Sequence, residues 1–266
     1  MRTRILTAIV LCAVIIGALV QPEPAYFGAV IGLMLLGGAW EWSGFLSGAT
    51  VGQRMGYVLL VLAVCVATRL YLWAPERFVW LLRFALLWWC VAFLWVLRAP
   101  PRIGALAAAL AGLLVLVPAV TTLLRIISEW QRGVSSVLLI AGIAVLMDIG
   151  GLVAGRAFGR RKLAPRVSPG KTWEGLYGGF LLLFVVAWGV SHWLPYARWP
   201  FIGLALAAGG FSVVGDLTES LFKRANGLKD SGRLLPGHGG VLDRIDSITA
   251  TAPVMALSLI WLGAGA

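Results

Sequence analysis

Long apolar segments constrain this sequence more than any other feature. Of its 266 residues 60% are hydrophobic and only 12% are charged, which is too apolar for a chain that presents its surface to water. A helix needs roughly 20 apolar residues to cross a hydrocarbon core about 30 Å thick. We therefore predict an all-α, polytopic integral membrane protein with about nine transmembrane helices. The apolar runs lie at about 5–20, 27–47, 55–74, 78–97, 103–126, 135–155, 176–194, 199–218 and 248–265.

The basic residues fall mostly on one of the two sides that nine helices would create. Lys and Arg next to spans are held on the cytoplasmic side, and the side of the N-terminus carries about sixteen of them against four. This asymmetry predicts a multi-pass protein of the cell (inner) membrane with a cytoplasmic N-terminus, and it accounts for the net charge of +11 without a nucleic-acid partner. The sixteen are Arg2, Arg4, Arg54, Arg98, Arg102, Arg156, Arg160, Arg161, Lys162, Arg166, Lys171, Lys223, Arg224, Lys229, Arg233 and Arg244.

The first apolar run has a second interpretation, as a cleaved signal peptide. Met1-Arg-Thr-Arg4 precedes it, as a basic region precedes the apolar region of a secretory signal. Gln21-Pro-Glu-Pro24 is a poor cleavage site because it lacks the small residues that signal peptidase requires. We favour a retained helix.

Acidic residues divide the chain into two unequal halves. We treat 1–266 as a single membrane domain in which 1–134 are mainly scaffold and 135–266 carry the catalytic helices and cytoplasmic loops. Glu41 is the exception in the first half, because it lies inside an apolar run where an ionisable group needs a partner. We favour a helix–helix hydrogen bond, or a position nearer the membrane interface than these boundaries indicate, over a catalytic role. Seven of the eleven acids crowd into about one hundred C-terminal residues, namely Asp148, Glu174, Asp216, Glu219, Asp230, Asp243 and Asp246.

The segment Gly215–Arg224 continues an apolar run with a row of charges. Positions i, i+3, i+4, i+7 and i+8 of a helix lie on one face, and here they form a possible site or a salt-bridged helix end. The five residues are Asp216, Glu219, Ser220, Lys223 and Arg224.

The segment from Lys229 to Asp246, KDSGRLLPGHGGVLDRID, combines charge with glycine. Its turn-forming residues expose backbone N–H groups that can meet phosphate oxygens. Asp243 and Asp246 then lie three apart on a restarted helix, and several carboxylates beside a basic, Gly-rich loop suit Mg²⁺ and a polyphosphate. The sequence leaves three roles open for His238: contact with phosphate, catalysis as a base, and a structural role in the turn.

A second charged cluster runs from Asp148 to Gly175. Asp148 near the end of a span is a functional candidate, and Arg156 follows it on the predicted cytoplasmic side. Ser168 before Pro169 fits the N-cap of a helix, whose N-terminus with Lys171 and Thr172 would form an anion site. The spacing excludes a Walker A loop. We attribute Arg160, Arg161 and Lys162 to topology and attraction to anionic headgroups.

These residues together resemble the signature of the phosphatidate cytidylyltransferases, or CDP-diacylglycerol synthases. The resemblance is carried by Ser220-Leu-Phe-Lys-Arg224, Lys229-Asp230, Pro236-Gly-His-Gly-Gly240 and Asp243-Arg-Ile-Asp246, with weaker support from Asp148-Ile-Gly-Gly and Ser168-Pro-Gly-Lys-Thr-Trp-Glu-Gly175. Where the family often has Ala-Tyr after Asp-x-Gly, this chain has Gly151-Leu152, so a tyrosine contact there is in doubt.

The resemblance implies transfer of a cytidylyl group from CTP to phosphatidic acid, giving CDP-diacylglycerol and pyrophosphate for phospholipid biosynthesis. It implies Mg²⁺ as cofactor, allows K⁺ beside it, and allows a homodimer. The implied metal ligands are Asp216, Asp243 and Asp246. The residues implied to stabilise phosphate charge are Lys223, Arg224, Lys229 and Arg244, with Ser220 orienting a phosphate or the water on the metal. Asp230 and His238 complete the catalytic group, with an Asp230–Arg244 ion pair as the structural alternative. The implied substrate-binding residues are Asp148, Arg156, Ser168, Lys171, Thr172 and Glu219.

Two other classes of function fit parts of the sequence. An ion transporter would also place carboxylates near spans and contain a broken, Gly-rich helix. It would distribute its polar residues toward the middle of several spans, whereas here they gather at the ends of late helices. The nearer alternative is an enzyme that transfers a cytidylyl group to an isoprenoid ether lipid, or another membrane phosphotransferase. The CDP-alcohol phosphotransferases are disfavoured because the DG-x-x-A-R motif is absent.

Overall fold

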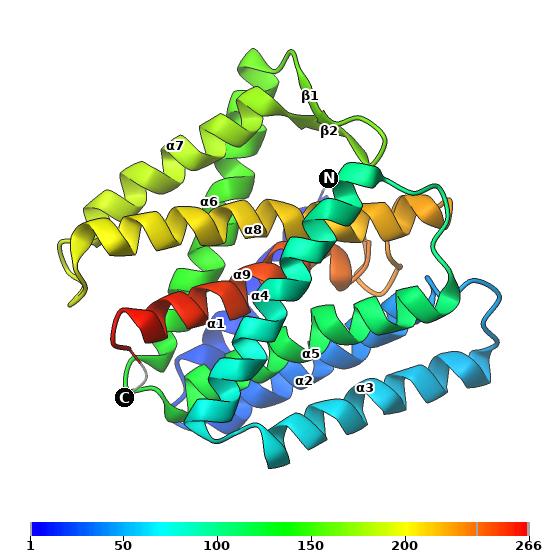
Figure 1. The fold of residues 1–266 in the computed structure, drawn as a ribbon, viewed down its shortest axis with the longest axis horizontal. Coiled ribbons are helices and arrows are strands. Elements are labelled where there is room, and N and C mark those ends of the chain that lie inside the picture. Colours follow the sequence, from blue (N-terminus) through cyan, green and yellow to red (C-terminus); the bar gives the residue numbers. More distant parts are fainter. Residues whose placement is uncertain (1, 238, 265–266) are drawn as a thin grey trace.

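The computed structural model describes residues 2–237 and 239–264, and this part of the chain folds into nine α-helices and one small two-stranded sheet (Figure 1). The all-α membrane fold is confirmed. The helices are α1 (Arg2–Leu19), α2 (Pro24–Ser43), α3 (Val51–Tyr71), α4 (Pro75–Arg98), α5 (Ala105–Glu129), α6 (Gly133–Phe158), α7 (Trp173–Val190), α8 (Arg198–Ala225) and α9 (Leu242–Trp261). The strands are β1 (Lys162–Ala164) and β2 (Ser168–Thr172).

Seven of the nine described helices, α2 to α8, are long and apolar enough to cross a membrane. The apolar part of α1 is shorter and spans Ile9–Leu19. Helix α9 begins at Leu242, six residues before the expected run, because the charged turn around Asp243 and Asp246 belongs to the helix. Many large apolar side chains are exposed, such as Leu59 on α3 and Trp80 on α4, as expected of surfaces that face lipid.

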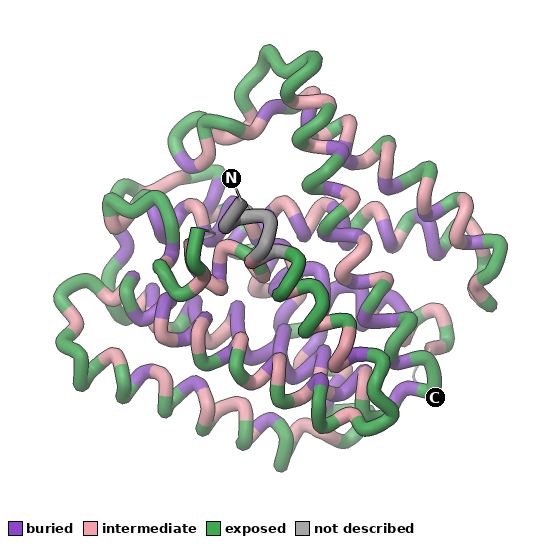
Figure 2. Tube along the Cα trace, turned by 180° about the vertical axis from the view of Figure 1, so that it is seen from behind, coloured by how far each residue is buried: buried purple, intermediate pink, exposed green. Residues whose placement is uncertain are grey.

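Helix α9 lies in the middle of the bundle, where it packs against α2, α4, α5, α6 and α8 (Figures 1 and 2). Its small residues allow this close approach, since Ala250, Ala252 and Ala256 are fully buried. At the point where α8 crosses α9, Gly215 faces the backbone carbonyl of Asp246, and a Cβ at Gly215 would overlap that oxygen. The acidic first turns of α9 are thereby held directly against the charged end of α8.

Helices α6 and α7 are joined by the hairpin of β1 and β2 and pack through glycines next to it. Gly150 of α6 faces the backbone of Gly178 and Gly179 of α7, and Gly175 faces the carbonyl of Gly151. Small residues at such positions let helix backbones approach closely in a membrane. Away from the hairpin the two helices separate, and α8 lies across the resulting V (Figure 1).

Gly178→Val is expected to destabilise the protein because a Cβ at this position overlaps the Cβ of Ala154 on α6. Overpacking of this kind costs about 1–3 kcal/mol, and the midpoint of thermal unfolding in detergent should fall accordingly. The matched control is Gly189→Val on the same helix, where an added Cβ meets no atom within 4 Å. Equal midpoints for the two variants would contradict the importance of this contact.

The hairpin corrects one prediction. Ser168 does not cap a helix: Ser168–Thr172 form β2, which pairs antiparallel with β1 through Lys162 opposite Thr172 and Ala164 opposite Ser168. The cap of α7 is Thr172, whose hydroxyl accepts a hydrogen bond from Gly175 N at 3.1 Å. A proline is as compatible with an extended segment as with the first turn of a helix, so Ser-Pro alone did not decide between them.

Candidate active site

The charged side chains of α8 gather near its C-terminal end. Ser220 Oγ donates to Asp216 Oδ1 at 3.3 Å, and Lys223 Nζ lies 3.2 Å from Glu219 Oε1, so these four side chains share one face as predicted. Arg224 differs, because it is exposed and its guanidinium donates to backbone carbonyls, from Nε to Val167 at 3.4 Å and from Nη1 to Leu228 at 3.2 Å. Arg224 therefore ties the end of α8 to the loop before β2.

Lys223 connects α8 to α9. Its Nζ donates to Asp243 Oδ1 at 2.7 Å, and the two side chains are each only 10% exposed. The other oxygen of Asp243, Oδ2, accepts from Gly240 N at 2.8 Å, from Ser231 Oγ at 3.0 Å and from Ser231 N at 3.1 Å. Asp243 thus holds the loop that joins the helices at two points, Ser231 in its interior and Gly240 near its end.

Glu41 of α2 contacts the same loop and the start of α9. It is 2% exposed, and its Oε2 accepts from Leu242 N at 2.9 Å and from Ser231 Oγ at 3.1 Å. A carboxylate at the first N–H groups of α9 is also favoured by the helix dipole. The predicted hydrogen-bond role of Glu41 is therefore confirmed, but its partners belong to the site rather than to a neighbouring span.

A second part of the site lies between α6, α7 and β2. A cavity of about 330 Å³ there is lined by four of the six predicted substrate-binding residues, Asp148, Ser168, Lys171 and Thr172, together with apolar residues such as Leu176. Lys171 Nζ lies 2.5 Å from Asp216 Oδ2, and this ion pair joins β2 to α8. The cavity thus combines an apolar wall with cationic and hydroxyl groups beside the acidic cluster.

The N-terminus of α7 is less open to an anion than the sequence indicated. Trp173 N donates to Arg161 O at 3.0 Å and Gly175 N donates to the Thr172 hydroxyl, so two of its first three N–H groups are used. Glu174 of this turn accepts from the backbone N–H of Arg160 at 3.0 Å. Arg156, predicted to bind substrate, is exposed in the last turn of α6 and does not line the cavity.

The loop between α8 and α9 borders a larger, polar cavity of about 690 Å³. Gly237 and Gly239 both have positive φ, of 77° and 83°, a conformation that side-chain-bearing residues rarely adopt. His238 lies outside the described residues. The charged residues that line this cavity are Lys229, Asp230, Arg233 and Arg244. Three cations around a cavity of this volume suit a polyphosphate anion.

Asp246 completes a group of carboxylates on α8 and α9. Its Oδ1 accepts from Ser247 N at 2.7 Å, and it lies close enough to Asp216 and Glu219 to interact with both. Within the described residues no three acidic, His or Cys side chains converge on one point as a complete metal site would. The donors are nevertheless hard oxygens of the kind that bind Mg²⁺, which commonly takes one or two carboxylates and completes its shell with water and substrate phosphate.

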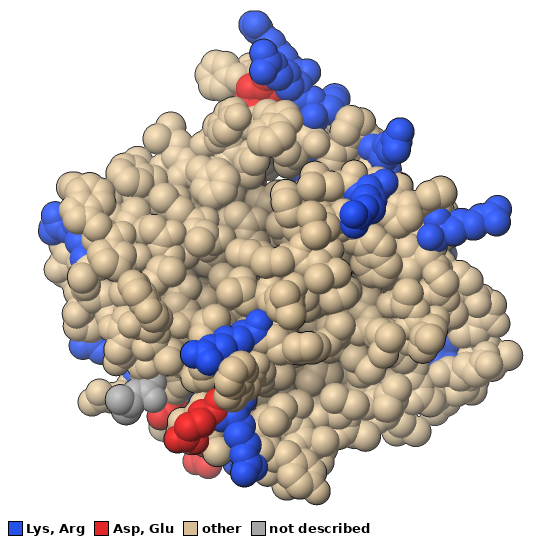
Figure 3. Space-filling model, viewed as in Figure 1, with Lys and Arg blue, Asp and Glu red and all other residues tan. Residues whose placement is uncertain are grey.

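The basic residues of the site extend onto the surface of the same end of the molecule. Figure 3 shows Lys and Arg gathered over the hairpin end, whereas most of the visible face below is uncharged apart from a mixed basic and acidic group near the lower edge. The exposed basic residues at and beside the hairpin are Arg156, Arg160, Arg161, Lys162 and Arg166. A positive rim of this kind attracts anionic nucleotides and lipid headgroups.

The fold and the site define a class: a polytopic helical membrane protein with an acidic cluster and two cationic cavities at one end of its bundle. The sequence matches the Cytidylyltransferase family over residues 2–262, so the chain belongs to that family. It is 40% identical over 269 residues to the phosphatidate cytidylyltransferase of Pseudomonas aeruginosa, covering 98% of this chain and 97% of the relative. It is 36% identical over 280 residues to that of Haemophilus influenzae, covering 95% and 96%.

Three residues of the site were not identified in the sequence as functional. Ser231 and the backbone of Gly240 hold Asp243, and Glu174 anchors the start of the hairpin. The position of Ser231 between Lys229-Asp230 and Gly232, inside the charged loop segment, was the one feature of the sequence that could have indicated a role for it. Its partner Glu41 is 190 positions away, so no local pattern reveals the contact.

Proposed function

We propose that this protein transfers the cytidylyl group of CTP to phosphatidic acid and releases pyrophosphate, giving CDP-diacylglycerol. The observation that carries the proposal is the Lys223–Asp243 pair, which joins the acidic face of α8 to the first turn of α9 in a chain of the cytidylyltransferase family. The names of the two similar proteins support the same substrates.

The two cavities are suited to the two substrates. The polar cavity beside Lys229, Arg233 and Arg244 suits the triphosphate of CTP. The cavity with Leu176, Ser168 and Lys171 offers an apolar wall and a cation, which suits the glycerol end and phosphate of phosphatidic acid. The acidic cluster, with Asp216 and Lys171 in contact, lies beside the second cavity and would face the α-phosphorus.

In the proposed reaction a phosphate oxygen of phosphatidic acid attacks the α-phosphorus of CTP. A new P–O bond forms as the bond to the bridging oxygen of pyrophosphate breaks, so both electrons of that bond leave with pyrophosphate. The attacking oxygen is already an anion, so no strong base is needed, and positioning and charge neutralisation are the main contributions of the protein. Lys171 would hold the attacking phosphate, while Lys229 and Arg244 would stabilise the departing one.

Mg²⁺ is part of the proposal, held by Asp216 and Asp246 with Asp243 as the third predicted ligand and with K⁺ as an optional neighbour. When bound, it would neutralise charge on the triphosphate. Asp243 has both oxygens engaged by protein donors, so the protein's own hydrogen bonds compete with it as a ligand. Asp216 also has both oxygens engaged, but by one donor each, and Asp246 accepts from Ser247 N on Oδ1. These two carboxylates have fewer donors to displace than Asp243 and are the stronger candidates.

We also propose that the N-terminus and the site face the cytoplasm of the cell (inner) membrane. The basic asymmetry supports this orientation, and CTP is a cytosolic solute whereas phosphatidic acid presents its phosphate at the membrane surface. Dimerisation stays a prediction.

The function is tested with purified protein in mixed micelles containing phosphatidic acid. With CTP labelled at the α-phosphate, we expect label to enter the lipid phase. With CTP labelled at the γ-phosphate, we expect label only in soluble pyrophosphate. Transfer of γ-label to lipid would indicate a kinase, and no transfer of either label by folded protein would refute the proposal.

Removal of divalent cations should abolish this transfer. EDTA is expected to reduce the rate to background, because the negative charge of the triphosphate is then left unneutralised beside the carboxylates of α8 and α9, which are Asp216, Glu219, Asp243 and Asp246. Added Mg²⁺ should restore the rate, and Ca²⁺ should restore it poorly, since its larger radius and flexible coordination favour a different geometry. Full activity in EDTA would exclude a divalent cofactor.

A further inference from the structure

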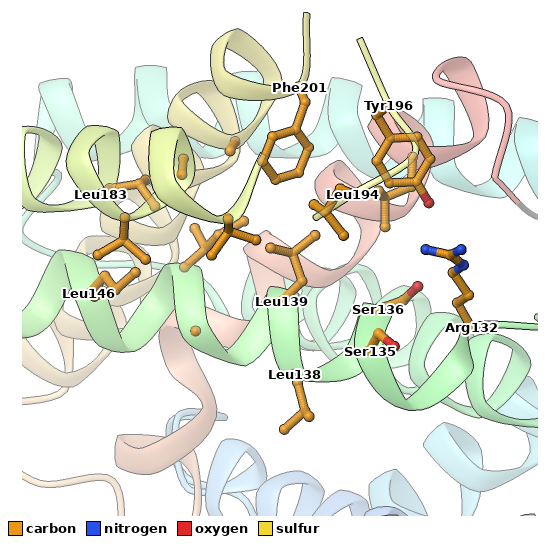
Figure 4. A pocket seen from close by; sticks show the side chains of 17 residues that line it. Arg132, Ser135, Ser136, Leu138, Leu139, Leu146, Leu183, Leu194, Tyr196 and Phe201 are labelled. Atoms are coloured by element: carbon orange, nitrogen blue, oxygen red, sulfur yellow. The ribbon is translucent and has the colours of Figure 1, made fainter. Parts of the chain in front are cut away.

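A cavity of about 360 Å³ lies at the opposite end of the bundle from the acidic cluster. It is bounded by the first turns of α6, the last turns of α7 and the first turns of α8 (Figure 4). The acidic cluster lies on α8 and α9, and Asp148 of α6 and Asp216 of α8 lie further along their helices than the residues that line this cavity. The cavity is therefore separate from the proposed substrate sites.

Most of this cavity is lined by aliphatic side chains. Leu146 of α6 faces Leu183 of α7 at one end, and Leu139 of α6 points toward Phe201 of α8 further along (Figure 4). The cavity exists because α6 and α7 touch through glycines only near the hairpin and separate toward this end. The cavity also borders α6 at Leu138, which is 52% exposed on the surface of the bundle. Its shape and lining suit an acyl chain that enters from the bilayer.

One end of the cavity is polar. Arg132, Ser136 and Tyr196 line it there, and the same three residues line an adjoining cavity of about 220 Å³ (Figure 4). Ser136 is only 4% exposed, and its hydroxyl has no hydrogen-bond partner in the described part of the chain. A hydroxyl that lines a cavity can donate a hydrogen bond to a phosphate oxygen bound there.

Arg132 gives this end a positive charge. It is exposed, it precedes the first turn of α6, and it forms no ion pair with any residue that the structure describes. Burial raises the pKa of the Tyr196 phenol, with Arg132 acting in the opposite direction, so the phenol remains a neutral hydrogen-bond donor. The N-terminus of the long helix α6 adds further positive potential at the same place.

We propose that this pair of cavities binds an anionic phospholipid that is not a substrate. Its phosphate contacts Arg132, Ser136 and Tyr196 in the smaller cavity, and one acyl chain lies between α6 and α7 in the larger one. Charge selects anionic over zwitterionic headgroups, since Arg132 is the one charged side chain among the described residues that line either cavity. The bound chain fills the space where α6 and α7 separate, and so completes the packing at this end.

The proposal is tested with phospholipids that carry a photoreactive diazirine in one acyl chain. Phosphatidylglycerol and phosphatidylcholine probes are incorporated into nanodiscs with the full-length protein, and cross-linked peptides are mapped by mass spectrometry. We expect the phosphatidylglycerol probe to label peptides of α6 and α7 around Leu139 and Leu183 about tenfold more than the phosphatidylcholine probe. Because phosphatidylglycerol is not the proposed substrate and the readout is binding, this result does not depend on cytidylyl transfer.

Two variants test the two parts of the site separately. Arg132→Gln should remove the preference for phosphatidylglycerol, whereas Arg77→Gln, at another exposed arginine away from the cavity, should retain it. Gly142→Phe should abolish labelling of these peptides by filling the cavity, because an added Cβ at Gly142 meets no atom within 4 Å. Gly32→Phe on α2 is its matched control. Equal labelling by both probes, unchanged in Gly142→Phe, would show annular lipid contact only and overturn the proposal.

Discussion

Asp243→Asn is expected to lower kcat/KM for cytidylyl transfer by roughly 10²- to 10⁴-fold. The substitution removes the anion from a pair that is 10% exposed on each side and holds α8, α9 and their connecting loop together. Breaking a buried ion pair costs about 3–5 kcal/mol, and about 1.4 kcal/mol corresponds to a factor of ten in rate. The measurement is the steady-state transfer of α-phosphate label from CTP to lipid.

An asparagine cannot replace this carboxylate in either orientation. One oxygen of Asp243 accepts from Lys223, and the other accepts from Gly240 N and Ser231. The amide NH₂ group would therefore face an N–H donor whichever way it is turned, and one donor would lose its partner. Glu76→Gln is the control, since Glu76 is an exposed acid in the first turn of α4.

A titration with Mg²⁺ then separates two roles for Asp243. If Asp243 is a metal ligand, the variant should need much more Mg²⁺ and regain part of its activity at saturation. If it organises the loop, as its four protein donors indicate, the Mg²⁺ dependence of the residual activity should match that of the wild type. Wild-type activity in a folded Asp243→Asn protein would contradict both roles.

The parts of this molecule that follow local rules could be predicted from its sequence. Apolar runs predicted the spanning helices because the bilayer requires both length and composition. The spacing of Asp216, Glu219, Ser220 and Lys223 predicted one shared face because the helical repeat is fixed. The hairpin could not be predicted this way, since Ser168-Pro169 is compatible with both a strand and a helix start and the pairing with β1 decided the outcome.

Contacts between distant segments could not be predicted from the sequence either. Lys171 and Asp216 are both recognisable as candidates, but their direct contact depends on how the hairpin folds over α8. Arg224 shares the helical spacing of the charged face, yet its long side chain turns to backbone carbonyls outside that face. Charge and spacing thus identified which residues gather at this end, whereas the tertiary packing determined which of them meet.

Glu41→Ala is expected to lower the transfer rate by about 10- to 100-fold although Glu41 lies on α2, outside the half of the chain that was predicted to be catalytic. Its carboxylate accepts hydrogen bonds from Leu242 N and Ser231 Oγ, and each bond to a charged group contributes about 1.5–3 kcal/mol. Without it, the buried N-terminus of α9 and the hydroxyl that holds Asp243 both lose a partner. The measurement is kcat and KM for CTP, with thermal unfolding to confirm that the variant is folded.

Glu41→Gln distinguishes positioning from chemistry at this residue. The amide oxygen can still accept from Leu242 N and Ser231 Oγ, so a positioning role predicts that Gln restores most of the activity lost in the alanine variant. A role that needs the negative charge or a proton predicts that Gln is as inactive as Ala. Glu23→Gln, an exposed acid just before the same helix, should behave like the wild type. Full activity in Glu41→Ala would mean that α9 and its loop keep their positions without this contact, and that Glu41 serves the stability of the bundle alone.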